Sequence, residues 1–241
     1  MYEKLRGVVL RTVKYNDKYS VVRVYTDGYG LLSFLLPQNG GKVSRVRRAL
    51  FQPLSLVEIE SNILPNRDIY RLSETRCMAP LMDLYSNPIK NSIALFITDL
   101  LSQVIIEREQ NAPLFSFLSS SIQLLDELDD GYANFHICFL YHLGIFIGIE
   151  PDVSTYRPNA YFDMLNGVFT DARPIHPHFV EGEEARALML LSRMTFANMH
   201  HFRFNRIQRK RLLKLTVDYY ALHHSSLGEL KSLEVLSELF E

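Results

Sequence analysis

The spacing of apolar residues changes near residue 80, and this change constrains the fold more than any other feature of the sequence. Up to residue 76, apolar and polar residues alternate in short runs, which is typical of β-strands with one buried face. Beyond residue 80, apolar residues recur at steps of three and four, which is typical of amphipathic helices. We therefore predict an α+β multidomain protein, with a β domain over residues 1–79 and a helical domain over residues 80–241.

The predicted β domain contains five short strand-like runs. They are "LRGVVLRTVKY", "SVVRVYT", "LLSFLLP", "LSLVEIES" and "IYRLSET", separated by Gly, Pro, Asn and Asp. The turn "TDGYG" predicts a tight hairpin between the second and third runs. Five strands in so short a domain favour a small barrel, for which the OB-fold is the common solution. A sandwich and an SH3-like barrel remain alternatives.

A basic loop, "QNGGKVSRVRRALFQP" at residues 38–53, separates the third and fourth runs. Its cations are Lys42, Arg45, Arg47 and Arg48, and it contains no acidic residue. Residues 1–76 hold 13 Lys and Arg against 7 Asp and Glu, whereas the remaining residues hold 13 against 20. This asymmetry favours a polyanion such as nucleic acid as the partner of the basic part. The alternative is that small β domains often carry Lys and Arg on their strands.

The first three strands add further candidates for nucleic-acid binding. Arg11 and Lys14 are candidates for phosphate contacts, and Tyr15 and Phe34 are candidates for stacking on bases. The alternative for each aromatic residue is a place in the core or at its rim.

Six segments have helical spacing, and a Pro-rich segment interrupts them. The segments are residues 91–109, 112–130, 133–149, 181–194, 206–223 and 230–240. The short link between the first two indicates antiparallel neighbours. The interruption at 150–180 predicts a hairpin around Asn166-Gly167.

The helix predicted over residues 206–223 has two unlike faces when its helical wheel is extended back to Arg203. The apolar residues Leu212, Leu215, Tyr219 and Leu222 fall within a sector of about 80° on a helical wheel. The opposite side carries Arg203, Arg206, Lys210 and Lys214, flanked by Arg209 and Arg211. No acidic residue lies between Arg203 and Lys214, so we predict phosphate binding on this face. A solvated surface helix is the alternative.

The sequence contains no motif for catalysis or metal binding. A phosphate-binding glycine loop, Gly-x-Ser-x-Gly, Cys-x-x-Cys and His-Glu-x-x-His are all absent. Cys77 and Cys138 form no disulfide framework and suit a reducing compartment. The most apolar run, residues 135–149, is too short to span a bilayer. We expect a cytoplasmic protein that is not an enzyme, with no cofactor, no bound metal and no membrane partner.

The order of these segments resembles the RecO family of bacterial recombination mediators. The resemblance rests on "GVVLRTVKYNDKYSVVRVYTDGYGLLSFLLP", on "GGKVSRVRRALFQPLSLVEIE", on an all-helical middle and on the closing "DYYALHHSSLGELKSLEVLSEL". It covers essentially the whole length and implies an N-terminal OB-fold and a helical C-terminal domain. It also implies binding to single- and double-stranded DNA near the nucleoid, and annealing of complementary strands without ATP. The implied partners are RecR and the C-terminal tail of single-stranded DNA-binding protein, with RecA loaded on gaps.

The sequence departs from the family pattern in one place. Many RecO proteins carry a four-cysteine zinc module after the third helix of the helical domain, whereas residues 150–180 contain no cysteine. We predict that the hairpin forms without zinc and is held by Tyr156, Tyr161, Phe162 and Phe169.

A protein-interaction adaptor is the second hypothesis. In that case the barrel and the apolar helices bind partner proteins, and the cations are solvated. A hydrolase has no supporting set of residues.

Overall fold

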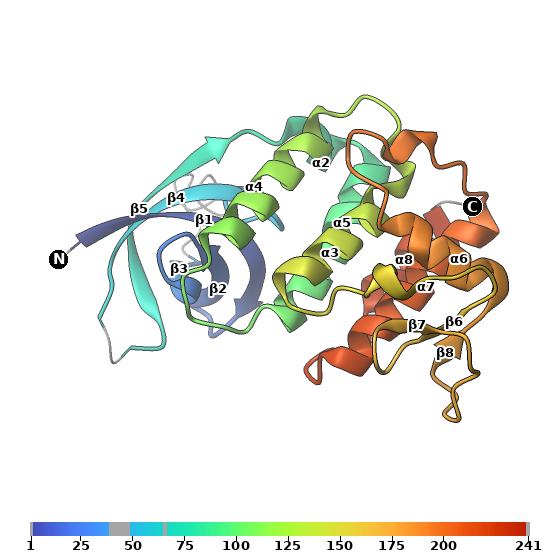
Figure 1. Ribbon diagram of the computed structural model, residues 1–241. Helices are drawn as coiled ribbons and strands as arrows, with labels where there is room; N and C mark the ends of the chain where they lie inside the picture. Colours follow the sequence, from blue (N-terminus) through green and yellow to red (C-terminus); the bar gives the residue numbers. More distant parts are fainter. Residues whose placement is uncertain (1, 39–48, 65–66, 240–241) are drawn as a thin grey trace. The chain divides into compact units, whose positions relative to one another are not determined.

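The computed structural model describes residues 2–38, 49–64 and 67–239 (Figure 1). By its internal contacts the chain forms two compact units, one made of Met1–Glu127 and Leu230–Leu239 and the other of residues 128–229. The four cations of the basic loop, Lys42, Arg45, Arg47 and Arg48, lie outside the described residues. The secondary structure changes from strand to helix just after residue 79. The predicted domain boundary between residues 79 and 80 stays a prediction.

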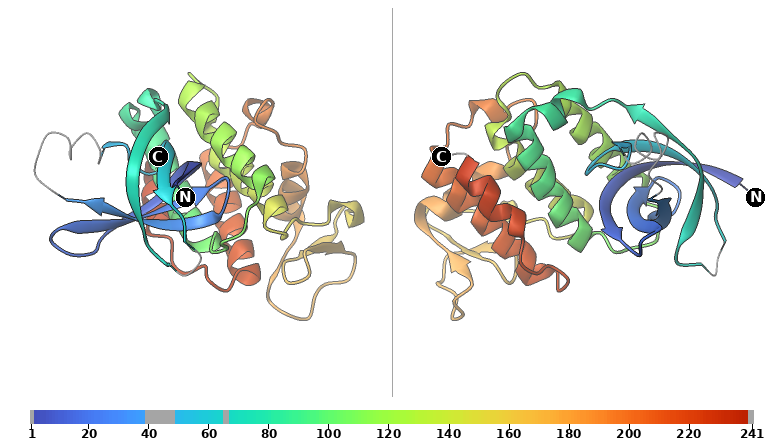
Figure 2. Two further views of the ribbon diagram at one scale, coloured as in Figure 1. Left: turned by 90° about the vertical axis from the view of Figure 1, so that its left-hand side faces the viewer. Right: turned by 180° about the vertical axis from the view of Figure 1, so that it is seen from behind.

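Five strands form a closed barrel in the first unit, drawn in blue to cyan in Figures 1 and 2. They are β1 (Tyr2–Lys14), β2 (Tyr19–Thr26), β3 (Gly30–Pro37), β4 (Leu56–Asn62) and β5 (Tyr70–Ala79). Their order is β1-β2-β3-β5-β4, and all neighbours are antiparallel except β3 and β5. All five predicted runs are strands, and the predicted α+β class is confirmed.

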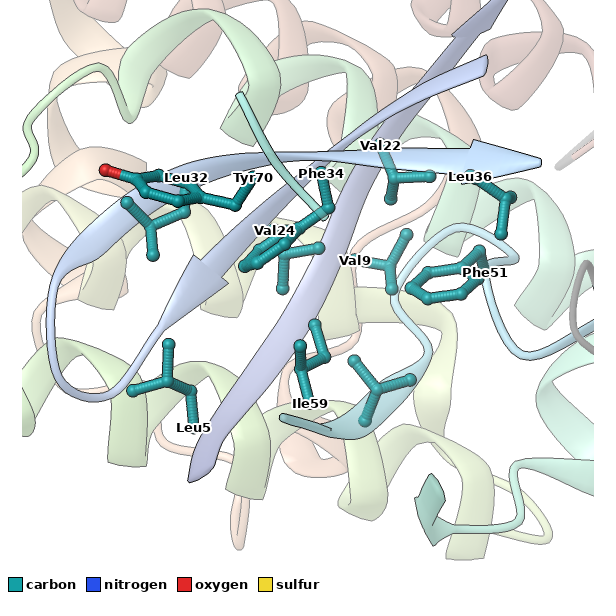
Figure 3. Packing of buried hydrophobic residues seen from close by; sticks show 11 residues of the cluster. Leu5, Val9, Val22, Val24, Leu32, Phe34, Leu36, Phe51, Ile59 and Tyr70 are labelled. Carbon is teal, nitrogen blue, oxygen red and sulfur yellow. The ribbon is translucent and has the colours of Figure 1, made fainter. Parts of the chain in front are cut away.

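The barrel interior is filled by side chains that alternate along the strands (Figure 3). Val22, Val24 and Phe34 are fully buried there, as are Val57 and Ile59 on β4. Burial of branched and aromatic side chains is the main force that stabilises so small a barrel.

Within the residues that the structure describes, four α-helices complete the first unit. They are α2 (Met82–Ser86), α3 (Pro88–Val104), α4 (Ala112–Glu127) and α8 (Lys231–Leu239). The side chain of Asn87 caps α3 by accepting hydrogen bonds from the backbone N–H groups of Ile89 and Lys90. The helix α2 was not predicted.

The predicted helix over 91–109 is wrong beyond Val104, where α3 ends. The next residues run along the barrel, and the carbonyl of Glu107 accepts a hydrogen bond of 3.0 Å from the backbone N–H of Leu31. A contact with β3 thus replaces the last predicted helical turn.

The helix α8 packs against α3, although more than a hundred residues separate the two in the sequence. The carboxylate of Asp99 on α3 accepts a hydrogen bond of 2.8 Å from the Ser232 hydroxyl, and Leu236 is fully buried. The first unit is therefore assembled from two separate stretches of the chain.

The second unit combines helices with a small sheet. Its elements are α5 (Phe135–Phe146), α6 (Gly182–Leu191), α7 (Arg206–His223), β6 (Tyr161–Asp163), β7 (Val168–Thr170) and β8 (Phe179–Val180). The sheet order is β7-β6-β8, so the predicted hairpin around Asn166-Gly167 is confirmed and β8 is an addition to it.

Aromatic side chains hold this sheet together, as predicted. The ring of Phe169 lies 4.9 Å from that of Phe162 and 5.1 Å from that of Tyr156, measured between centroids. The ring of Tyr161 lies 5.7 Å from that of Phe179 on β8. Among the residues that the structure describes, no three His, Cys, Asp or Glu side chains are grouped so that they would hold a metal ion.

Over the same described ranges, no helix has the length and apolar character needed to cross a bilayer.

Candidate nucleic-acid interface

The helix α7 begins at Arg206 because a capping box fixes its start. The Asn205 side chain accepts a hydrogen bond of 2.9 Å from the backbone N–H of Gln208, and the Gln208 side chain accepts one of 3.0 Å from the backbone N–H of Asn205. Arg203 is exposed but precedes the helix, so its predicted place on the helical face is wrong.

One face of α7 is buried and the other carries cations. Leu212, Leu213, Leu215, Tyr219 and Tyr220 are among its buried residues. The exposed cations are Arg206, Lys210, Arg211 and Lys214.

These four cations share an open groove with a volume of about 630 Å³, which Asn205 and Ile207 also line. The side chain of Ile207 is 65% exposed among them. The groove lies at the N-terminal part of the helix, where the helix dipole favours anions. Its chemistry suits a phosphate group beside an apolar or planar group.

An acidic residue offsets one end of this face. The Lys214 ammonium lies 2.8 Å from a carboxylate oxygen of Asp218, one helical turn further along. Because both side chains are exposed, such a pair contributes less than about 1 kcal/mol and exchanges readily with another anion. The i,i+4 spacing of the two residues is the sequence signal for this pair.

Arg209 turns away from the cationic face. Its Nε donates a hydrogen bond of 3.1 Å to the Asn134 side chain, and its guanidinium donates another of 3.1 Å to the carbonyl of Phe204. Burial lowers the pKa of this guanidinium. Arg209 therefore makes internal contacts in this structure, and we exclude it from the cationic face.

The buried His136 on α5 lies near Arg209 and gives the second unit a sensitivity to acid. Burial, with the Arg209 charge as a second cause, lowers the pKa of His136 to about 3. In an unfolded chain the pKa of histidine is about 6.5. Between these two values the unfolded chain binds more protons, so stability is lost as the pH falls below about 6.5.

We expect this residue alone to lower the free energy of unfolding by roughly 2 kcal/mol between pH 6.5 and pH 5. Urea denaturation at a series of pH values measures the effect. The His136→Gln variant should lose this part of the pH dependence, whereas His201→Gln, at an exposed position, should keep it. Equal pH dependence in wild type and His136→Gln would contradict the assignment.

In the barrel, the predicted site residues divide into exposed and buried ones. Arg11, Lys14 and Tyr15 are exposed, and the side chain of Tyr15 is 62% accessible. Phe34 points into the barrel core, with its ring 6.0 Å from that of Tyr70 (Figure 3). A fully buried ring has no face open to a base, so Phe34 is withdrawn as a stacking residue.

Two arginines near Arg11 were missed by the sequence interpretation. Arg23 lies directly opposite Arg11 across β1 and β2. Burial lowers the pKa of Arg23, and the charges of Arg11 and Arg108 lower it further. The register of the β1–β2 hairpin is the sequence signal that could have placed Arg23 beside Arg11. No local sequence pattern places Arg108 beside Arg23.

The chain as a whole matches known sequences over both regions. The family model described as "Recombination protein O N terminal" matches residues 1–81, and "Recombination protein O C terminal" matches residues 85–234. Proteins named DNA repair protein RecO are similar along the whole chain. They include those of Phocaeicola vulgatus, 41% identical, Bacteroides fragilis, 40% identical, and Azobacteroides pseudotrichonymphae, 35% identical, each with 100% of both chains covered.

The N-terminal match covers the barrel, and the C-terminal match covers the helical region. Together they define a class of recombination proteins that have these two parts. The chain belongs to the RecO family of DNA repair proteins.

Proposed function

We propose that this protein is a recombination mediator that binds single- and double-stranded DNA and carries out no enzymatic step. The observation that carries the proposal is the cationic face of α7, made of Arg206, Lys210, Arg211 and Lys214, in a region matched by the family. Contacts from Lys and Arg to phosphates would supply most of the affinity. The cations of the basic loop, residues 42–48, would add to them.

We propose that the barrel is an OB-fold and that residues 1–79 form a DNA-binding domain. The strand order β1-β2-β3-β5-β4, closed through a parallel contact between β3 and β5, supports this assignment. OB-folds commonly bind single strands with cations and exposed aromatic side chains.

Annealing would follow from the same contacts. Cations on the protein reduce the repulsion between two strands, and bases that are not held remain free to pair. In the cell the protein would act with RecR, bind the tail of single-stranded DNA-binding protein, and help RecA load onto coated single strands.

Fluorescence anisotropy with a labelled 30-nucleotide single strand tests DNA binding. With four phosphate contacts, we expect the affinity to fall about 50-fold between 50 mM and 200 mM salt. The Lys210→Ala/Arg211→Ala variant should bind roughly ten-fold more weakly at low salt and show a shallower salt dependence.

The matched control is Arg186→Ala/Arg193→Ala, which removes two exposed cations outside the groove. It should bind almost as well as wild type. Equal losses of DNA affinity in both variants would show that net charge alone explains the effect. If the wild-type protein does not bind the strand at 50 mM salt, direct DNA binding is rejected.

A second groove favours the adaptor hypothesis as an alternative. It has a volume of about 580 Å³, and its apolar lining includes Met164, Val180 and Leu222. Its charged lining consists of Arg211, Lys214, Glu184 and Asp218. On this hypothesis the groove would bind a short peptide that combines apolar and acidic residues, such as the acidic tail of single-stranded DNA-binding protein. Binding of that tail peptide without any binding of DNA would favour the adaptor.

A further inference from the structure

On the outer face of β1, β2 and β3, side chains that are neighbours across the strands form three rows. A β-bulge between Val9 and Arg11 shifts the register, so the odd-numbered residues that follow face away from the barrel core. From there the three blue strands extend together past the rest of the barrel (Figure 2). The rows, by register, are Arg11 with Arg23 and Ser33, Val13 with Val21 and Leu35, and the tyrosines Tyr15 and Tyr19 with Pro37.

The first row places like charges together. Arg11 and Arg23 are direct cross-strand partners, and like charges in such positions destabilise a sheet. Arg108 adds a third guanidinium charge that acts on Arg23. Its guanidinium donates a hydrogen bond of 2.8 Å to Asp68, whose side chain is 84% exposed. The Arg23 guanidinium donates a long hydrogen bond of 3.5 Å to the Ser102 carbonyl. A bound anion would relieve this repulsion.

The third row presents two aromatic side chains at a fixed turn. The backbone N–H of Tyr15 donates a hydrogen bond of 3.0 Å to the carbonyl of Tyr19. The side chain of Asn16 accepts hydrogen bonds of 2.9 Å from the backbone N–H groups of Lys18 and Tyr19. Tyr15 is 62% exposed and Tyr19 is 36% exposed. The turn therefore fixes the backbone that carries both tyrosines before any ligand arrives, which lowers the ordering cost on binding.

The distance between the rows suits an extended strand of nucleic acid. Tyr15 follows the last residue of β1 and lies four residue steps beyond Arg11, which corresponds to about 13 Å. Between them Val13, 45% exposed, continues the apolar surface. A few nucleotides of a single strand span such a face, with phosphates at one end and bases at the other.

We propose that this outer face of β1, β2 and β3 is a subsite selective for single-stranded DNA. Tyr15 and Tyr19 stack on unpaired bases, and Arg11 and Arg23 bind the adjoining phosphates. The bases of a duplex are already stacked on one another, so the tyrosines contribute only to single strands. The inference rests on the proposed DNA binding and assigns a preference to one face of the barrel.

Equilibrium binding of the full-length Tyr15→Ala/Tyr19→Ala variant to a short oligothymidylate and to a duplex of mixed sequence tests the subsite. We expect at least ten-fold weaker binding to the single strand and less than a two-fold change for the duplex. The Tyr15→Phe/Tyr19→Phe variant should retain single-strand affinity because the rings remain. Tyr2→Ala is the matched control, since Tyr2 lies at the other end of β1 and, like Tyr15, is 62% exposed.

Each outcome separates this inference from the proposed function. Wild type that binds DNA, with unchanged single-strand affinity in the double alanine variant, would overturn the subsite and leave DNA binding standing. Equal losses for single strand and duplex would show a general phosphate surface instead. Wild type that binds neither nucleic acid would overturn both proposals.

Discussion

Replacing Gly30 by alanine is expected to lower the free energy of unfolding by about 3 kcal/mol or more. Gly30 begins β3 with a φ of +62°, a conformation that L-residues rarely adopt. A Cβ at this position would lie 2.5 Å from the carbonyl oxygen of Glu109 and 2.8 Å from that of Glu107. Both are backbone atoms, so the overlap cannot be relieved by turning a side chain.

The expected result is that residues 105–111 separate from β3, with loss of the hydrogen bond between Leu31 and Glu107. Thermal and urea denaturation measure the loss of stability. Gly28→Ala is the matched control, because its Cβ would meet only the flexible end of Leu5 at 3.1 Å. Similar stability in the two variants would show that the close approach at Gly30 is unimportant.

Removing the carboxylate of Asp83 is expected to destabilise the protein by about 3 kcal/mol, more than removing its cationic partner. The Lys90 side chain on α3 has no exposed surface, whereas that of Asp83 is 51% exposed. The Lys90 ammonium donates hydrogen bonds to the Asp83 carboxylate and to the Asp126 carbonyl, the latter at 2.9 Å. The Asp83→Ala variant therefore leaves a buried charge without this counter-ion.

Lys90→Met removes the charge and keeps most of the packing volume. The remaining Asp83 is half-exposed and can be hydrated, so we expect a loss of only about 1 kcal/mol. The double variant Asp83→Ala/Lys90→Met should then be more stable than Asp83→Ala alone. Urea denaturation of the three variants measures this coupling, and strictly additive losses would contradict it.

The sequence predicts the elements of the fold well because most of them are determined locally. The alternation that buries Val22, Val24 and Phe34 is a property of neighbouring residues, and so is the capping box at Asn205 and Gln208. For the same reason the predicted bounds of α7, residues 206–223, agree with the structure. The family resemblance is confirmed by the matches along the whole chain.

What the sequence did not predict depends on distant contacts. The end of α3 at Val104 is determined by pairing of Glu107 with Leu31 on β3. Phe34 faces inward because of the register of the closed barrel, and Arg209 turns inward because Asn134 lies beside it. A helical wheel or an alternating pattern gives the faces of an element but not the partner that each face meets. The cationic face of α7 was predictable because its residues share one helix.

The order in which the chain leaves the ribosome has a consequence for α8. Residues 231–239 complete the same compact unit as the barrel, yet they are synthesised after all of residues 128–229. Until then the α3 surface that receives Leu236, and the Asp99 carboxylate that bonds to Ser232, have no partner from α8. During synthesis the apolar surface of α3 therefore stays uncovered until α8 has been made. Chaperones bind such exposed apolar surfaces, and neighbouring nascent chains associate through them. A barrel cut from the chain after α4 would keep that surface permanently.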